Sequence, residues 1–390
     1  MKRKYIFIGI LFVLIVILGS VKLYGNTKKD TKPITTLYVA VSDDITSYIN
    51  DKNINRILLN KYNLKVIYDS WDNNKIISKP LIREVANNNV KEVTSKLQEE
   101  LDINSENITK YDALLTSEER YAYYYEEEAD KTKGEADRYS VIGHYTVAST
   151  PLVIYSWMDV VDYLVVENVV TLDKNTYYIS NPNKLFNYIL NGKKWNEIGL
   201  KSLTHSINIS SADPTLSNTG ASYYELLLSI LSDNNIDNQS IDSNLKKLSL
   251  FYQKSGYMNN TQTGLFDRYL KTGIGGEVMI VDYEKSIIDF ANINPTGFDE
   301  IKDKMVVLYP EPTINNSNCL LSFSEKGQKL IEAFKDEEIA KILWDKYGYR
   351  NSDNDVTNNN LNIGIPSKIE NVVNNLNMIY YNKMVEYLSK

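Results

Sequence analysis

The segment Asp213–Gly220 (DPTLSNTG) combines short hydroxyl side chains with a glycine, immediately before an apolar stretch at 221–231 that is typical of a helix. Small side chains let a ligand approach the backbone closely. The first backbone N–H groups of a helix lack internal partners and carry partial positive charge, so they can bind an anion or a polar oxygen. The same residues also suit plain capping, and Ser222–Glu225 fits a capping box by itself. From these residues alone, a binding site and a helix cap are equally good interpretations.

The sequence offers little that could support catalysis. No Gly-x-Ser-x-Gly motif occurs, and no phosphate-binding loop with Gly-Lys-Ser/Thr. A serine hydrolase would need His144 or His205 beside Ser210 or Ser211, and nothing in the sequence places an acid and a base next to them. Gly273–Gly276 precedes a predicted strand instead of following one, so it fails the test for dinucleotide binding. We therefore expect no enzyme activity and no cofactor.

Composition narrows the function further. The chain has 390 residues, with 43 Lys and Arg against 50 Asp and Glu, so its net charge is −7. Hydrophobic residues make up 43% and charged residues 24%, a globular mixture long enough for about two domains. The acidic balance argues against nucleic-acid binding. The single Cys319 excludes a disulfide framework and a multi-cysteine metal site, and two histidines argue against a histidine-ligated metal enzyme, so we expect no metal.

The N-terminus predicts an extracytoplasmic location. Met1–Lys4 is positively charged, and the uncharged run Tyr5–Val21 is just long enough to cross a membrane with the positive residues inside. A cleaved secretory signal is the alternative, but the exit at Gly19–Gly25 is a poor cleavage site, so we favour an anchor within 1–25. Asn26–Thr36 is a polar tether. The protein is thus expected in the cell membrane, single-pass, with its bulk outside.

Beyond the tether, short apolar strands alternate with polar loops and helices. This alternation is typical of a parallel, doubly wound α/β sheet, in which ligands lie beyond the carboxyl ends of the strands. Polar breaks at Ser42, Ser70 and Thr116–Ser117 follow the first three predicted strands. The predicted strands are Leu37–Val41, Leu64–Tyr68, Tyr111–Leu115, Ile207–Ile209, Gly276–Val281 and Met305–Tyr309. The predicted helices include Ile45–Tyr62, Pro80–Leu101, Ala221–Leu231, Glu325–Tyr347 and Val372–Leu388.

Two segments are ambiguous. Val141–Trp157 is apolar but long for one strand, so it is either two strands or a crossover between lobes. Glu118–Arg138 is charged and rich in tyrosine, which usually indicates a solvated helix; an aromatic contact surface is the functional alternative.

Several motifs together resemble bacterial extracellular solute-binding proteins of ABC transporters. Asp213–Gly220 is similar to their Asp-Pro-x-x-Ser-x-(Ser/Thr)-Gly element, in the molybdate- and sulfate-like subgroup. The other matching stretches, in the same order, are Asp112–Ser117, Ala148–Ile154, Gly276–Glu284 and Phe334–Arg350. The sequence departs from the family in lacking a lipid-anchor cysteine and in carrying Tyr349 where phenylalanine is usual.

The resemblance implies a two-lobe fold of the type II periplasmic-binding-protein class. Lobe 1 would comprise 37–155 and a return at 306–390, and lobe 2 would comprise 156–305. A small polar or anionic solute would be held between the lobes and delivered to an ABC-type permease in the same membrane by a monomeric receptor. The implied ligand-binding residues are Ser42, Ser70, Thr116, Ser117, Ser217, Asn218, Thr219, Gly220 and Tyr283.

Acidic residues complicate an anionic solute. If Asp43, Asp44, Asp213 and Glu284 face the cleft, they favour a cation or a hydroxyl-rich ligand; capping of loops is their ordinary role, and we favour it for Asp43 and Asp44. A second function class is a surface interaction protein that retains the fold and binds a protein or cell-wall partner, for example through Tyr121–Glu128. A deep cleft lined by Ser42, Thr116 and Thr219 would favour the receptor.

Overall fold

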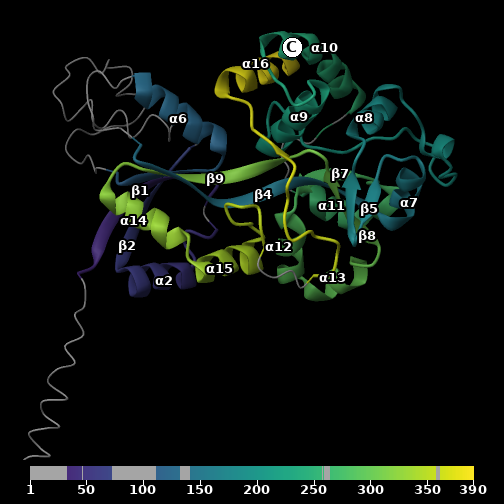
Figure 1. Ribbon diagram of the computed structural model, residues 1–390. Coiled ribbons are helices and arrows are strands. Elements are labelled where there is room, and N and C mark those ends of the chain that lie inside the picture. The colour runs from purple at the N-terminus through teal and green to yellow at the C-terminus, as the bar shows by residue number, and fades with distance from the viewer. Residues whose placement is uncertain are drawn as a thin grey trace, which may run out of the picture.

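The computed structural model describes residues 33–45, 47–72, 111–131, 141–256, 258, 264–356 and 361–390 (Figure 1). The predicted membrane segment Tyr5–Val21, most of the tether and the predicted helix Pro80–Leu101 lie outside these residues. Within the described ranges, no helix has the length and apolar character needed to cross a bilayer.

Two long antiparallel strands connect the two halves of the molecule. They are β4 (Gly143–Trp157) and β9 (Thr313–Ser322), and Figure 1 shows them running side by side from one group of helices to the other. They belong to one mixed sheet with the strand order β2-β1-β3-β9-β4-β8-β6-β5; β7 pairs with β4, and β10 pairs with β9. The apolar run Val141–Trp157 is therefore one strand that crosses between lobes, with a bulge between Thr146 and Ala148.

The first lobe is built on the predicted parallel strands. In it, β1 (Thr35–Ser42) lies between β2 (Leu64–Trp71) and β3 (Ala113–Thr116) and is parallel to both. Neighbouring residues of β1 alternate between two cores, because Val39 packs with one cluster and Ala40 with another on the opposite face. The helices of this lobe are α2 (Lys52–Tyr62), α6 (Glu119–Lys131), α14 (Glu325–Phe334) and α15 (Glu337–Tyr347).

The predicted helix Glu325–Tyr347 is two helices. Lys335 ends α14, and the Asp336 carboxylate accepts a hydrogen bond from the backbone N–H of Glu338 at 2.9 Å, so it caps the start of α15. An aspartate side chain that competes for backbone N–H groups favours a new helix start over a continuous helix.

The second lobe holds the larger core. Its strands are β5 (Thr171–Asp173), β6 (Thr176–Ile179), β7 (Ile280–Tyr283), β8 (Met305–Pro310) and β10 (Val372–Val373). Its helices are α7 (Met158–Val166), α8 (Pro182–Leu190), α9 (Asn218–Leu231), α10 (Asn238–Lys254), α11 (Leu265–Thr272), α12 (Lys285–Ile293), α13 (Pro295–Ile301) and α16 (Met378–Leu388), with short 3-10 turns at Trp195–Ile198 and Gly273–Gly275.

Two predicted elements of this lobe differ from the structure. Ile207–Ile209 is a buried connection and not a strand; the flanking residues Ser206 and Ser210 form isolated bridges, to Lys194 and Ile280. The last helix begins at Met378, where Asn377 caps it, rather than at Val372, which lies in β10.

The C-terminal segment packs on the second lobe. Met384 and Leu388 of α16 belong to the larger core, and α16 lies against α10 (Figure 1). β8 pairs with β4 and β6. The predicted division, in which 306–390 returns to lobe 1, stays a prediction.

Candidate functional site

A cavity of about 710 Å³ opens between the lobes. The first lobe and the crossing strand β9 contribute the residues Asp44, Ile45, Ser117, Tyr349, Asn316 and Asn318. The second lobe contributes Asn218, Thr219, Gly264, Phe266, Asp267, Asp282, Tyr283, Lys285, Ser286, Asp289, Phe290 and Ile293. We call this cavity the interlobe cleft.

The carboxyl ends of β1 and β3 form the first-lobe wall of the cleft. These strands are parallel neighbours, so the loops that follow them lie together. The buried Ser42 hydroxyl accepts a hydrogen bond from the backbone N–H of Ser117 at 3.1 Å. Thr116 is also fully buried, and its hydroxyl donates to the carbonyl of Glu118 at 3.0 Å. Ser42 and Thr116 therefore hold the loop in place, and Ser117 is the predicted residue of this loop that lines the cleft.

Ser70 lies apart from the other predicted residues. It is exposed on the edge strand β2, opposite Val41 of β1, and it is not among the residues that line the cleft. The sequence does not reveal that β2 lies at the sheet edge, one strand further from the cleft than β1.

The first turn of α9 forms the second-lobe wall. Ser217 caps the helix by accepting a hydrogen bond from the backbone N–H of Gly220 at 3.4 Å. Asn218 and Thr219 line the cleft. Gly220 packs against the turn before the helix, because a Cβ there would lie 2.4 Å from the carbonyl oxygen of Ala212. The segment is thus a helix cap and a cleft wall at once.

The capping box expected at Ser222–Glu225 is wrong, because α9 starts four residues earlier, at Asn218. Both side chains lie inside the helix and make other contacts. The Tyr283 hydroxyl donates to Ser222 Oγ at 3.1 Å, and Glu225 pairs with Arg120 of the first lobe. Burial raises the pKa of Tyr283, so its phenol stays neutral in the cleft wall.

The charge of the cleft is negative. Among the residues that the structure describes, Asp44, Asp267, Asp282 and Asp289 line it together with one cationic side chain, Lys285. Asp282 is buried, whereas Asp44 and Asp267 are exposed at the rim. Lys285 Nζ lies 3.7 Å from an Asp289 carboxylate oxygen and 5.5 Å from the centre of the Tyr349 ring.

Ionisation of the cleft follows from these neighbours. Burial raises the pKa of Asp289, although Lys285 opposes the shift. Burial lowers the pKa of Lys285, but the Tyr349 hydroxyl and the nearby Asp289 and Asp282 charges outweigh it, so the net pKa is raised. Lys285 therefore remains charged, and it offsets one of the four carboxylates.

Three other acidic residues singled out by the sequence lie outside the cleft lining. Glu284 is fully buried and accepts hydrogen bonds from Arg350 at 2.6 and 2.7 Å and from Tyr309 at 2.6 Å. Asp213 accepts from the Thr215 backbone N–H at 2.8 Å, which is a loop-capping role. Asp43 is exposed, whereas its neighbour Asp44 lines the cleft.

Sequence reasoning missed the aromatic and amide part of the cleft. Phe266 and Phe290 come from α11 and α12, and Asn316 and Asn318 come from β9. Asn318 donates to the Ser117 carbonyl at 2.8 Å and accepts from Tyr48 at 3.2 Å, which ties the crossing strand to the first-lobe loop. β9 was not predicted because the polar run Asn315–Asn318 interrupts its apolar pattern. The apolar residues that remain, Ile314 and Cys319–Leu321, are too few to indicate a strand.

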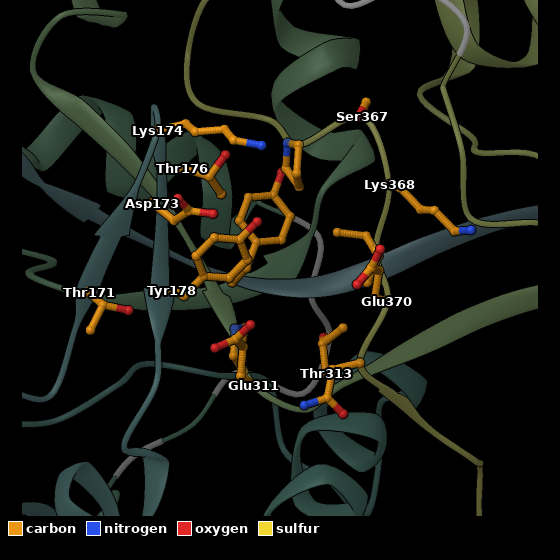
Figure 2. Close-up of a pocket in the computed structure, with 15 residues that line it drawn as sticks. Thr171, Asp173, Lys174, Thr176, Tyr178, Glu311, Thr313, Ser367, Lys368 and Glu370 are labelled. Atoms are coloured by element: carbon orange, nitrogen blue, oxygen red, sulfur yellow. The ribbon is translucent and has the colours of Figure 1, made fainter.

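A second cavity, of about 600 Å³, lies on the second lobe between the β5–β6 hairpin, the end of β8 and residues 366–371 (Figure 2). Figure 2 shows Asp173, Glu311 and Glu370 around it, with Lys174 and Lys368 nearby. Burial and the Asp173 charge raise the pKa of Glu311. None of the nine predicted site residues lines this cavity.

Comparison with known proteins gives a structural match and no sequence match. No protein-family model matches the chain, and no curated protein matches it. A structure described as an extracellular solute-binding protein from Bordetella parapertussis is similar, with a TM-score of 0.54 and 11% identity over 91% of this chain and 96% of that one. An ABC transporter protein from Clostridium perfringens has a TM-score of 0.51 and 11% identity, over 90% and 98%.

The Bordetella ferric binding protein is also similar, with a TM-score of 0.51 and 11% identity over 91% of this chain and 98% of that one. These similarities extend through both lobes, and at such identities they concern the fold. The chain therefore has the α/β fold of the extracellular solute-binding proteins of ABC transporters.

Proposed function

We propose that this protein is a solute receptor that captures a small molecule in the interlobe cleft. The observation that carries the proposal is that one cavity is lined from both lobes, at strand ends and at a helix N-terminus. Of the predicted ligand-binding residues, Ser117, Asn218, Thr219 and Tyr283 line it. In our proposal they contact the solute, Ser42, Thr116, Ser217 and Gly220 hold the loops behind them, and Ser70 takes no part.

The charge of the cleft favours a solute that carries positive charge. Its described lining has four carboxylates and one lysine, so an anion would lose its hydration in a negative field. An ammonium group, by contrast, could donate to Asp44 or Asp282 and lie on the faces of aromatic residues such as Phe266. We therefore propose an amine-bearing solute in place of the anion that the sequence resemblance implied. Membership of the molybdate- and sulfate-like subgroup stays a prediction, and this charge argues against it.

One of the similar structures is named as a ferric binding protein, so a protein with this fold can carry a positively charged solute. The cleft here differs from what a bare metal ion needs. Its volume and its aromatic rings suit an organic cation better than a compact ion, which would require a small cage of oxygen ligands.

We further propose that Tyr5–Val21 anchors the protein in the membrane, with 26–36 as a tether. In this proposal the receptor is a monomer, and a permease recognises its solute-bound, closed form. Solute bound between two lobes would shift the population toward the closed form. The mass of the mature N-terminus tests the anchor: retention of residues 1–25 supports it, and a chain that starts beyond Val21 contradicts it.

The alternative, a surface interaction protein, has less support. Tyr121 and Tyr125 of the proposed contact segment are buried, which leaves Tyr123 as an exposed ring, 48% exposed. A cleft of about 710 Å³ is open rather than filled, although Thr219 alone of the three expected residues lines it.

Titration calorimetry on the full chain tests the receptor proposal. The panel should contain a polyamine, a basic amino acid, a neutral sugar and an oxyanion, with a thermal shift measured for each. We expect saturable binding and a raised melting temperature with an amine-bearing solute and none with the oxyanion. Tight oxyanion binding would refute the charge argument, and silence across the panel would refute the receptor.

A further inference from the structure

Three side chains of different metal-ligand types meet in the first lobe, away from the interlobe cleft. They are Glu119, His144 and Cys319, and one ligand atom of each lies within 4.8 Å of the other two. None of the three lines the cleft. The residues that the structure describes contain no second group of this kind.

The fold positions these side chains through its sheet. Cys319 of β9 is directly opposite Thr146 of β4, and His144 lies two residues before Thr146, so His144 and Cys319 are diagonal neighbours on one face. This face is covered by α6, whose first turn carries Glu119. Two ligands on paired strands and one on a packed helix make an arrangement that needs little rearrangement to bind an ion.

The surroundings of the group suit a cation. A Glu126 carboxylate oxygen lies 3.2 Å from His144 Nδ1, where it can accept the ring proton, as carboxylates do behind metal-bound histidines. The Tyr123 hydroxyl donates to a Glu119 carboxylate oxygen at 3.2 Å. The carboxylates of Glu119 and Glu126 therefore bring negative charge to His144 and Cys319.

We propose that Glu119, His144 and Cys319 bind a divalent transition-metal ion of the zinc class. A thiolate, an imidazole and a carboxylate are the ligands that zinc takes in proteins. Bond lengths of about 2.0–2.3 Å require ligand atoms roughly 3–4 Å apart, so a contraction of about 1 Å closes the site. On binding, the sulfur–metal bond forms as the Cys319 proton leaves to solvent, and a water occupies the fourth position.

Binding would fasten α6 to the sheet. The residue after Glu119 is Arg120, which pairs with Glu225 of the second lobe, so an ion here would stabilise the helix that makes this contact between lobes. The expected role is structural, because the ion would join α6 to two paired strands.

Cobalt(II) titration of the metal-free full chain, without a histidine tag, tests the proposal. We expect a near-ultraviolet charge-transfer absorption that saturates at one equivalent, reports a thiolate ligand and is displaced by zinc. Cys319→Ser should abolish this band, and His144→Gln should weaken zinc binding at least about 10-fold, by analogy with the loss of an outer-shell partner. Glu126→Gln should weaken it about 10- to 100-fold.

His205→Gln is the matched control, because this exposed histidine of the second lobe should leave zinc binding unchanged. Since Cys319→Ser alters a buried position, the surface variants His144→Gln and Glu119→Gln keep the test independent of folding. No band with cobalt, or a band that persists without Cys319, would overturn the proposal.

Discussion

Arg120 of α6 donates a hydrogen bond to Glu225 of α9, and this ion pair joins the two lobes with both side chains 1% exposed. Arg120 also pairs with Glu118 at 2.5 Å. The second oxygen of Glu225 accepts from the backbone N–H of Leu376 at 3.0 Å, and the guanidinium lies 4.0 Å from the centre of the Tyr381 ring. The cluster therefore also connects the C-terminal segment to the contact between lobes.

Arg120→Met should destabilise the fold strongly. The substitution leaves Glu118 and Glu225 buried without their positive partner, and loss of one member of a buried pair costs about 3–5 kcal/mol. The free energy of unfolding in urea measures the effect. Arg56→Met is the matched control, because Arg56 is exposed on α2. Equal midpoints for the two variants would show that the buried pair contributes nothing to stability.

Asp44→Asn should weaken binding of an amine-bearing solute about 10-fold, or about 1.4 kcal/mol, because it removes a carboxylate from the cleft wall. Asp43→Asn makes the same change one residue earlier, at an exposed position outside the cleft lining, and should leave the affinity unchanged. Calorimetry at two salt concentrations measures both, and the gap between the variants should shrink at high salt. Equal losses in both variants would mean that long-range charge, and not the cleft, controls affinity.

Asp51 should make the stability of the first lobe fall in acid. It caps α2 and accepts hydrogen bonds from Lys346 and, at 2.7 Å, from Tyr347. Burial opposes its ionisation, but these bonds and two backbone N–H groups lower its pKa from 3.8 to about 2. Because the pKa of Asp51 is lower in the folded state than in the unfolded state, its ionisation stabilises the fold at any pH above the unfolded-state pKa. This stabilisation is lost as the pH falls from about 4 to about 2, through the folded-state pKa.

Asp51→Asn isolates that contribution, because asparagine can still cap the helix but cannot ionise. We expect the wild-type protein to be more stable than the variant by about 1 kcal/mol at neutral pH, since solvent screens part of the interaction. The difference should disappear near pH 2 in urea titrations. A difference that is constant from pH 7 to pH 2 would contradict the assigned role.

Gly220→Ala should disturb the cleft wall. Its Cβ would lie 2.4 Å from the backbone oxygen of Ala212, so the turn must shift, at a cost of about 1–3 kcal/mol. Because Asn218 and Thr219 adjoin it, solute affinity should fall along with the melting temperature. Gly275→Ala is the control, since its Cβ would meet nothing within 4 Å. A melting temperature for Gly220→Ala equal to that of the control would show that the turn adapts freely.

Local pattern predicted the elements whose signals lie within one segment. Leu37–Val41 and Leu64–Tyr68 are mostly apolar runs between polar breaks, and both lie in strands; 221–231 is mostly apolar, and it lies in a buried helix. Such runs favour burial: β1 lies inside the sheet and α9 in the core, whereas the edge strand β2 keeps part of its run exposed. The hydroxyl-rich turn at Asp213–Gly220 was visible for the same reason, because a helix start has a local chemistry.

What the sequence determined by itself was a globular α/β chain with polar turns at strand ends; the tertiary structure decided which of these turns share a cavity. Ser117 and Thr219 line the cleft together, whereas Ser70 does not, because the order of strands in a sheet depends on long-range pairing that leaves no local pattern. The position of β9 and the charge of the cleft also depend on the tertiary structure. Asp44, Asp282 and Asp289 come from distant parts of the chain, and only the fold brings their carboxylates into one negative field.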